Sequence, residues 1–374
     1  MELQCLDAKR GAFHRLKIKK KEQLTKNTFA MELEVPRELQ ENYVFQAGQY
    51  VALKYTHQGK DFFNDYSMTS APSEGTLELG IKINPQPSST NSLFENYQVG
   101  DEIWVSEPRG RFTIEAKPDE FRTIVGFAAG IGITPILSHF KEILLTEPRT
   151  RLFLFYGNKS KKDVAYRQEL EKLEDDYKER LEVHYFYSQE KIGNAFFEGR
   201  LDDHKLKLII NQIMMIDDTD EESTLWDAVD HVLICGKGPM IRSIAVACFE
   251  HGIPKKNIHF ELFESFNEDI YPIEKTFPIV NDIKVDFKYN GKEYKTVLAN
   301  NKYRLLQSLL QLDFPLPFSC KSGICGSCQC KLNKGEVELL ENEYLTAKEE
   351  KDGYILACMS VPLSDEIELD FDNV

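Results

Sequence analysis

Short segments of alternating apolar and polar residues fill the first third of the chain. They occupy residues 13–24, 28–36, 50–56, 77–83 and 101–108, and turn residues separate them. Alternation with a period of two is typical of strands that bury one face, and a series of such strands indicates an antiparallel barrel. We therefore predict a small antiparallel β-barrel over residues 11–117.

From about Phe121 the pattern changes to alternating strands and helices. Residues 122–130 form a short apolar run that ends in glycine, and residues 132–145 follow with apolar positions at helical spacing. Further apolar runs lie at 151–158 and 231–235. This alternation predicts an α/β domain with a parallel sheet over residues 118–268.

The C-terminal part predicts a third, β-rich domain over residues 281–374, after a linker at 269–280. Residues 283–299 read as two strands joined at Asn290-Gly291, a dipeptide that favours a tight hairpin, and residues 366–372 alternate like a closing strand. Between them lies a predicted amphipathic helix. Its apolar face is expected to comprise Leu305, Leu306, Leu309, Leu310 and Leu312.

Four cysteines of this last domain have a spacing with a chemical meaning. Cys320, Cys325 and Cys328 form a C-x4-C-x2-C array, and Cys358 follows after 29 intervening residues. This spacing is typical of the plant-type [2Fe–2S] cluster, in which four thiolates hold two irons. The sequence therefore predicts these four cysteines as metal ligands.

Two other uses of the same cysteines compete with a cluster. A structural zinc site usually pairs two C-x2-C units, whereas only one pair has that spacing here. Disulfides are less expected, because nothing at the N-terminus indicates export. Cys330 falls outside the array and reads as an ordinary buried strand residue. Gly323 and Gly326 favour the cluster, since they let the loop fold tightly and direct N–H groups at sulfur.

Composition narrows the possible partners and location. The 374 residues suggest two or three domains, and the net charge of −15 argues against nucleic acid or an anionic membrane as a partner. No uninterrupted apolar run is long enough to span a bilayer, and no signal peptide is evident. We expect a cytoplasmic protein.

Within the predicted barrel, FQAGQYVALKY and NDYSMTSAP resemble the flavin-binding barrel of the ferredoxin–NADP reductase superfamily. That family holds its flavin with an Arg-x-Tyr-Ser motif. The resemblance implies that Tyr66 packs against the flavin and that Ser67, a predicted catalytic residue, lies near its N5. Asn64 stands where the arginine would be, and Lys82 is a candidate to replace its charge.

The next segment, SSTNSLFENYQVGD, resembles the second phosphate-binding stretch of the same family. The resemblance implies that Ser89, Thr90 and Asn91 donate to the flavin phosphate at the start of a short helix. We expect FAD as the flavin, with FMN as the alternative that the missing arginine leaves open.

In the α/β domain, AAGIGITPILS resembles the nicotinamide-nucleotide turn of these reductases. Gly130 and Gly132 would permit close approach of the pyrophosphate to the backbone, and Thr134 and Pro135 would begin the helix whose N-terminus meets its charge.

The segment after the next strand resembles the family's adenosine-end site. Where an NAD-specific site often has a carboxylate, the chain offers Asn158, Lys159, Ser160 and Arg167. Such donors suit a 2′-phosphate, so the sequence favours NADPH, with NADH as the alternative.

Two further segments resemble the part of the family's site beside the nicotinamide and flavin rings. HVLICGKGPM implies Cys235 as a catalytic residue, with Gly236 and Met240 in contact with the cofactor. HFELF implies Glu261 as a second catalytic residue and Phe263 as an aromatic beside the flavin. A buried strand cysteine without a role is the alternative for Cys235.

The three modules together imply an NAD(P)H-dependent reductase that passes electrons through flavin and a [2Fe–2S] cluster to a partner. Residues 185–206 resemble the reductase subunits of phenylacetyl-CoA epoxidases, so the expected partner is an oxygenase component of that di-iron type. The alternatives are a general reductase that serves another one-electron acceptor, and a non-catalytic protein whose four cysteines bind zinc.

Overall fold

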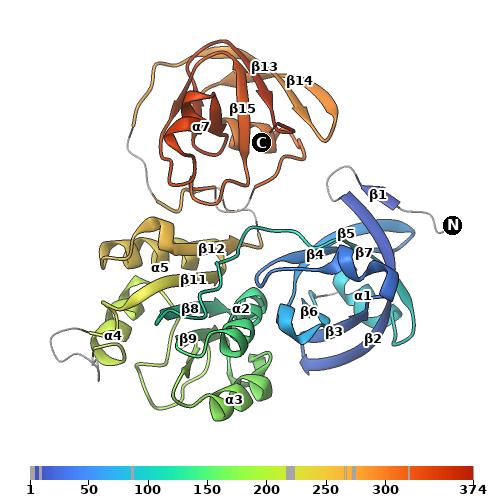
Figure 1. Cartoon of the computed structure of the whole chain (residues 1–374), viewed down its shortest axis with the longest axis vertical. Coiled ribbons are helices and arrows are strands. Elements are labelled where there is room, and N and C mark those ends of the chain that lie inside the picture. Colours follow the sequence, from blue (N-terminus) through green and yellow to red (C-terminus); the bar gives the residue numbers. More distant parts are fainter. Residues whose placement is uncertain are drawn as a thin grey trace. The chain divides into compact units, whose positions relative to one another are not determined.

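The structure is a computed structural model that describes residues 5–7, 11–85, 88–215, 224–264, 266, 268–271, 275–318 and 321–373. The chain forms two compact units, residues 1–265 and residues 266–374. Figure 1 shows the elements of both units, coloured along the sequence.

The first part of unit one is a curled antiparallel sheet with strand order β5-β4-β7-β2-β3-β6, and β1 pairs with β2. Its strands are β1 (Cys5–Asp7), β2 (Gly11–Thr25), β3 (Thr28–Glu34), β4 (Tyr50–His57), β5 (Lys60–Ser67), β6 (Leu77–Lys82) and β7 (Glu102–Ser106). A bridge between Met68 and Leu79 joins the two ends of this order, so the sheet curls back on itself. Helix α1 (Ser89–Asn96) follows β6.

The alternation in the sequence explains the barrel. The inward residues of β2, β3, β4 and β6 form one apolar cluster, which includes Leu16, Ile18, Phe29, Met31, Val51, Leu53, Leu79 and Ile81. Each of these side chains is fully buried. Because successive strand residues point to opposite faces, the polar residues between them face outward.

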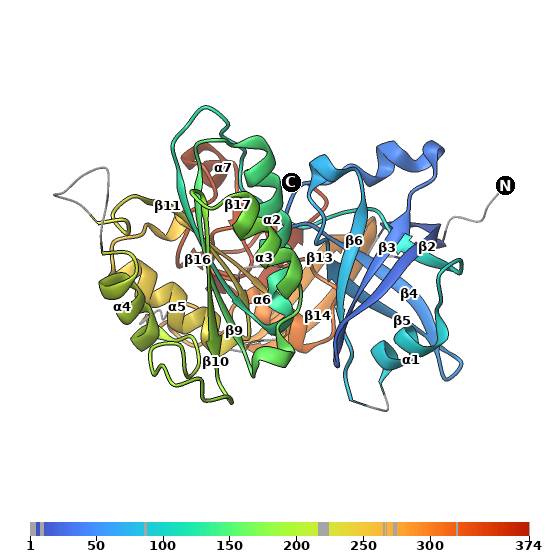
Figure 2. The same ribbon diagram turned by 90° about the horizontal axis from the view of Figure 1, so that it is seen from below.

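The second part of unit one is a parallel sheet with strand order β10-β9-β8-β11-β12. Its strands are β8 (Thr123–Ala129), β9 (Arg151–Asn158), β10 (Leu181–Tyr187), β11 (Val229–Gly236) and β12 (Ile258–Leu262). The helices are α2 (Ile133–Thr146), α3 (Arg167–Asp176), α4 (Asp203–Gln212) and α5 (Gly238–Glu250). Figure 2 shows α2 and α3 on one face of the sheet and α4 and α5 on the other.

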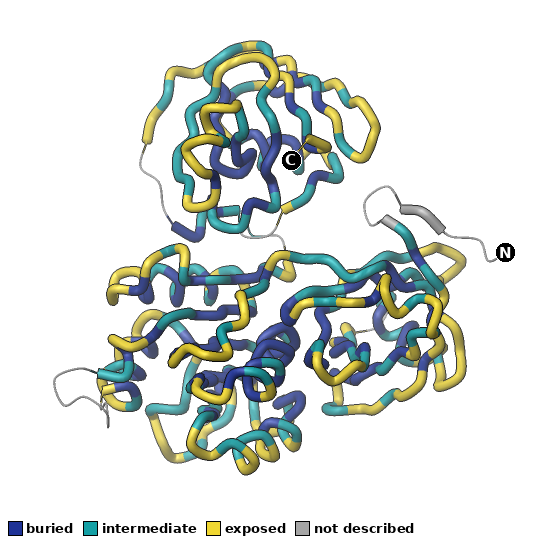
Figure 3. Tube along the Cα trace, viewed as in Figure 1, coloured by how far each residue is buried: buried dark blue, intermediate teal, exposed yellow. Residues whose placement is uncertain are grey.

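Helix α2 is buried along most of its length (Figure 3). Its buried residues include the apolar Ile136 and Phe140 and also the polar Ser138, His139 and Lys141. A helix buried on more than one face lies between layers, and α2 contacts both the parallel sheet and the barrel. The two parts of unit one therefore share an interior.

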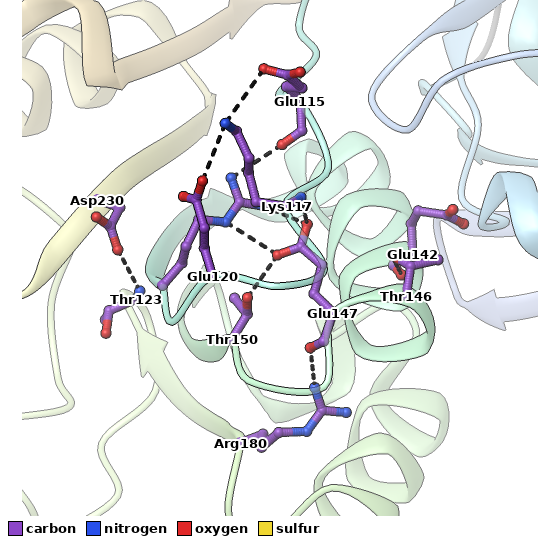
Figure 4. A network of polar contacts seen from close by, with 11 residues as sticks. Glu115, Lys117, Glu120, Thr123, Glu142, Thr146, Glu147, Thr150, Arg180 and Asp230 are labelled. Carbon is purple, nitrogen blue, oxygen red and sulfur yellow. Dashed lines mark hydrogen bonds and ion pairs between the residues drawn. The ribbon is translucent and has the colours of Figure 1, made fainter.

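A buried polar network lies at the amino-terminal edge of the parallel sheet (Figure 4). Glu147, just after α2, pairs with Arg122, just before β8, and their side chains are 1% and 4% exposed. Thr150 Oγ1 and the backbone N–H of Lys117 also donate to this carboxylate, at 2.7 and 3.1 Å. Burial opposes ionisation, but these donors outweigh it and lower the pKa of Glu147. The network fixes the connection from the barrel to the sheet.

Unit two has a five-stranded sheet with order β14-β13-β19-β15-β17 and a separate β16-β18 pair. Its elements are β13 (Asn281–Tyr289), β14 (Lys292–Asn300), α6 (Leu305–Gln311), β15 (Gln329–Lys334), β16 (Val337–Leu339), α7 (Ala347–Lys351), β17 (Tyr354–Leu356), β18 (Ser360–Pro362) and β19 (Glu366–Asp370). The hairpin of β13 and β14 turns at Asn290 and Gly291, which both have positive φ. One apolar cluster, which includes Val285, Leu305, Leu309 and Ile367, forms the core.

The predicted fold class is confirmed: an antiparallel flavin-type barrel, a parallel α/β sheet and a ferredoxin-type domain. One core prediction was wrong. Leu312 lies beyond the end of α6 and is 46% exposed, because the helix stops one residue earlier than the apolar pattern. The domain boundaries stay predictions, and residues 272–274 of the predicted linker lie outside the described residues. Within the described part of the chain, every helix is too short or too polar to cross a lipid bilayer.

Candidate active site and metal centre

Three of the predicted flavin residues lie around Tyr55, which ends the segment FQAGQYVALKY but was not itself predicted as a site residue. The Asn64 side-chain amide donates to the Tyr55 hydroxyl, which donates to Ser89 Oγ at 3.2 Å. The Tyr66 hydroxyl lies 3.3 Å from the same Tyr55 oxygen. The cluster is polar but carries no formal charge. Tyr55 occupies an inward position of β4. The alternation of apolar and polar residues indicates that such a side chain is buried, but it does not indicate which groups its hydroxyl contacts.

The other predicted flavin-phosphate residues are less closely grouped. Ser88 caps α1 by accepting from the Asn91 backbone N–H at 3.2 Å, and buried Thr90 accepts from the Asn84 backbone N–H at 2.9 Å. Lys82 ends β6 as an exposed residue. The N-terminus of α1 therefore lies beside the Tyr55 cluster through Ser89, whereas Lys82 stays a prediction as the replacement for the arginine charge.

The three predicted catalytic residues lie at the border of the barrel and the parallel sheet. Ser67, at the end of β5, donates a hydrogen bond of 3.3 Å to Glu261 of β12. Cys235 is the register partner of Glu261 on the neighbouring strand β11. Ser67, Cys235 and Glu261 are 4%, 0% and 7% exposed. The Ser67 hydroxyl, the Cys235 thiol and the Glu261 carboxyl therefore lie together in a region that is buried from solvent.

Burial sets the protonation of this group. Desolvation raises the pKa of Glu261 to about 8, against a smaller lowering by the Ser67 hydrogen bond. Desolvation also raises the pKa of Cys235, and Glu261 adds to that shift. At neutral pH both side chains are therefore protonated, and neither adds a negative charge to this buried region.

The glycine turn before α2 is shaped by close packing. The turn Gly130–Gly132 follows β8, and Gly130 has φ +56° and accepts from the Tyr156 hydroxyl at 2.9 Å. A Cβ on Gly132 would lie 2.2 Å from the carbonyl oxygen of Cys235. The turn and the carboxyl end of β11 can therefore approach only because residue 132 is glycine. Thr134 closes the turn by donating to the Ile131 carbonyl at 3.0 Å.

Three more of the predicted cofactor residues are Pro135, Met240 and Phe263. Pro135 is buried in the first turn of α2. Met240, in the first turn of α5, packs over Gly236, where an added Cβ would lie 3.2 Å from the methionine sulfur. Phe263 follows β12 and is 41% exposed. An exposed aromatic two residues after Glu261 is available to cover a flat ring.

The predicted adenosine end contains an orphaned polar group. The side-chain nitrogen and oxygen of Asn158 are buried at the end of β9 without a hydrogen-bond partner among the described residues. Such groups are costly unless a ligand satisfies them, so Asn158 fits a nucleotide. Lys159 is exposed, Ser160 donates to Asp163 at 2.6 Å, and Arg167 pairs with Glu171 at 2.8 Å.

Three of the four predicted cysteine ligands, Cys325, Cys328 and Cys358, lie among the described residues of unit two. Cys328 and Cys358 are 3% and 4% exposed, and the Cys358 backbone N–H donates to the Cys328 sulfur at 3.4 Å. The Cys325 thiol lies 3.3 Å from Ser327 Oγ. Cys320 lies outside the described residues. Among the residues that are described, no three His, Cys, Asp or Glu side chains form a group that could hold a metal ion.

The backbone of the cysteine loop fits a compact inorganic core. Lys321, Gly323 and Gly326 all have positive φ, which winds the loop tightly. A Cβ on Gly326 would lie 2.3 Å from the ring of Tyr344, so a side chain cannot fill this position. With two buried cysteines, and the backbone N–H of Cys358 donating to the Cys328 sulfur, the donor set and the loop fit an iron–sulfur cluster. Cys330, as predicted, is a buried strand residue.

Comparison with known families places the three parts of the chain. Residues 15–114 match the oxidoreductase FAD-binding domain, residues 127–245 the oxidoreductase NAD-binding domain, and residues 287–363 the 2Fe-2S iron-sulfur cluster binding domain. The chain is therefore an oxidoreductase of the class that combines FAD, NAD and 2Fe-2S domains in one polypeptide. The expected cofactor classes are confirmed.

Individual proteins resemble the chain over nearly its whole length. It is 29% identical to one of the subunits of the 1,2-phenylacetyl-CoA epoxidase of Escherichia coli, over 96% of this chain and 98% of that protein. It is 27% identical to the ferredoxin reductase component of 3-ketosteroid-9-alpha-monooxygenase of Rhodococcus rhodochrous, over 93% of each. The solved structure of phthalate dioxygenase reductase shares the fold, with a TM-score of 0.52, 22% identity and coverage of 96% and 98%.

Proposed function

We propose that this chain takes electrons from NADPH, with NADH as the alternative, and delivers them to the oxygenase component of a phenylacetyl-CoA epoxidase. The observation that carries the choice of acceptor is the similarity to the Escherichia coli epoxidase subunit, which extends through all three domains. When bound, flavin accepts the two electrons of a hydride and returns them singly, as an iron–sulfur cluster requires.

The buried contact between Ser67 and Glu261 supports the proposed location of hydride transfer. Its two halves come from the flavin-type barrel and the nucleotide-type sheet, which supports a proposal that the two ring systems meet at this contact. Neutral Glu261 can donate a hydrogen bond, and Cys235 and Gly132 keep the floor of the site closely packed. These residues would orient the rings and exclude water rather than act as a general base.

The adenosine end supports a phosphorylated nucleotide. Asn158 would gain its missing hydrogen bonds from the nucleotide, and Lys159 and Arg167 supply positive charge nearby in the sequence. Arg167 is already paired with Glu171, so a 2′-phosphate would have to share it. Comparison of NADPH with NADH as the reductant tests this part of the proposal.

Cys320, Cys325, Cys328 and Cys358 would hold the [2Fe–2S] cluster, and the Cys358 backbone N–H would donate to the ligated Cys328 sulfur. The test is anaerobic mixing of the purified protein with NADPH or NADH while flavin and cluster absorbance are followed. In Cys325→Ala the cluster signal should disappear while the flavin is still reduced. Cys330→Ala, a buried cysteine outside the array, is the matched control. Zinc without iron in freshly isolated protein would contradict the proposal.

The acceptor is tested separately. When this chain is mixed with the oxygenase subunits of phenylacetyl-CoA epoxidase, it should support epoxidation of phenylacetyl-CoA that depends on NADPH and O2. A second candidate acceptor is the oxygenase of a steroid-type system, since a ketosteroid monooxygenase reductase is 27% identical over a similar length. If epoxidation fails while artificial acceptors are reduced rapidly, the acceptor is wrong and the reductase assignment stands.

A further inference from the structure

The stretch from Ser67 to Ser70, which begins with the last residue of the predicted flavin motif, is hydrogen-bonded to three different segments of the nucleotide-type domain. The hydrogen bonds are Ser67 Oγ to Glu261 of β12 (3.3 Å), the Tyr166 hydroxyl to Thr69 Oγ1 (3.3 Å) and Ser138 Oγ of α2 to the Ser70 carbonyl (2.7 Å). All of the side chains that take part are buried. Three of these four residues therefore connect the barrel to the nucleotide-type domain.

Tyr166 is an unusual member of this set. It directly precedes α3, and its φ of +57° lies in the left-handed region that aromatic residues rarely occupy. Its side chain is only 4% exposed. Its hydroxyl donates to Thr69, and the Thr69 hydroxyl donates in turn to Glu78 Oε1 at 2.7 Å. An uncommon backbone conformation that is held by a directed hydrogen-bond chain points to a positional role.

Gly80 of β6 explains how Tyr166 reaches the barrel. A Cβ on Gly80 would lie 2.5 Å from Thr134 Cγ2 and 2.9 Å from the Tyr166 hydroxyl. Thr134 belongs to the first turn of α2, directly after the glycine turn Gly130–Gly132. The missing side chain thus lets both Tyr166 and the start of α2 lie against the barrel.

We propose that Tyr166 and Gly80 are positioning residues for hydride transfer. They fix the place of the glycine turn relative to Ser67, through Thr134 on one side and Thr69 on the other. Neither residue would touch a reacting atom. The inference rests on the proposed function, because it takes Ser67 and the glycine turn as the flavin and nicotinamide sides of the site.

The size of the effect follows from the distances. In Gly80→Ala the methyl group must move away from Thr134 from 2.5 Å to an ordinary contact of at least 3.4 Å, a displacement of about 0.9 Å. A misplacement of about 1 Å can cost roughly 100-fold in rate when the geometry of two reactants is critical. Tyr166→Phe removes one hydrogen bond without adding bulk, so we expect a loss of about tenfold.

The experiment measures the rate of flavin reduction in the full-length holoprotein by anaerobic stopped flow, over a range of NAD(P)H concentrations. This separates the limiting rate constant from the dissociation constant. Hydrogen–deuterium exchange of residues 66–72 and 164–170 in the same preparations reports the contact without reference to activity. Tyr177→Phe, at the other end of α3, is the matched control. Thr69→Val and the double variant with Tyr166→Phe test whether the two hydroxyls act together.

The expected result is a lower limiting rate in Gly80→Ala and Tyr166→Phe, dissociation constants within about twofold of the unchanged protein, and faster exchange in both segments. The double variant should lose no more than the larger of its single effects. A limiting rate equal to that of Tyr177→Phe, or a loss confined to the dissociation constant, would overturn the proposal. If Gly80→Ala does not fold, the Tyr166 and Thr69 variants decide. Failure of the unchanged protein to be reduced by either nucleotide would instead overturn the proposed function.

Discussion

Replacement of Glu261 by glutamine should make the stability of unit one less dependent on pH. Desolvation raises the pKa of Glu261 in the folded protein to about 8, from an ordinary 4.5. Below pH 4.5 the carboxyl is protonated whether the chain is folded or not. As the pH rises above 4.5 the unfolded chain loses this proton while the folded protein keeps it, so the folded state is progressively penalised until about pH 8.

The magnitude follows from the same two values. Their difference is about 3.5 pH units (8 minus 4.5), and one unit corresponds to about 1.4 kcal/mol. The penalty therefore approaches about 5 kcal/mol above pH 8, as an upper bound. Glutamine is neutral at every pH and retains a polar atom for the Ser67 hydroxyl, so the variant should escape most of this penalty.

The assay is urea unfolding, followed by flavin and tryptophan fluorescence. It is carried out at a pH of about 5, where the penalty from Glu261 is still small, and at a pH of about 9, where the penalty is nearly complete. The midpoints of the two proteins should be similar in acid, and the Glu261→Gln midpoint should be clearly higher in base. Glu250→Gln, at the exposed end of α5, is the control. Parallel pH profiles of the unchanged protein and Glu261→Gln would show that the carboxyl ionises normally and would refute the reasoning.

Three further predictions follow from other parts of unit one. Glu147→Ala should lower the free energy of unfolding by about 3–5 kcal/mol, because it leaves a buried guanidinium unpaired, whereas exposed Glu120→Ala should change it by less than about 1 kcal/mol in the same denaturation assay. Gly132→Ala should abolish nucleotide binding measured by calorimetry while flavin content stays normal, since its methyl group would collide with β11. Asn158→Leu should weaken NADPH binding without lowering the nucleotide-free melting temperature, because the buried amide has no partner to lose among the described residues; a lower melting temperature with unchanged binding would contradict this.

Patterns that depend on local chemistry were readable in the sequence. Strands β2, β3, β4, β6 and β7 were indicated by alternation, because each buries one face. The glycine turn before α2 was indicated by GIGITP, whose glycines the structure explains by the approach of β11. Helical spacing misled the sequence analysis at Leu312. This apolar residue continues the spacing, although the helix has already ended.

Contacts between distant segments were not readable. The sequence analysis assigned no role to Tyr55, and only the fold shows its hydroxyl between Asn64 and Ser89. The attachment of Thr69 to Tyr166 joins residues 97 positions apart, and no spacing rule connects them. Sequence reasoning found the residues with a family motif and missed those whose role depends on which surfaces meet.

The separate cores of the two units have an evolutionary consequence. Among the described residues, the apolar cluster of the C-terminal unit contains no side chain from unit one, whereas Phe112 of the connecting segment packs in the same cluster as Ile136 of α2. Mutations within the apolar core of the C-terminal unit therefore change side chains that share no apolar cluster with the parallel sheet. The barrel and the parallel sheet, by contrast, must change in concert, so lineages of this chain should exchange their C-terminal units more readily than they recombine within the first 265 residues.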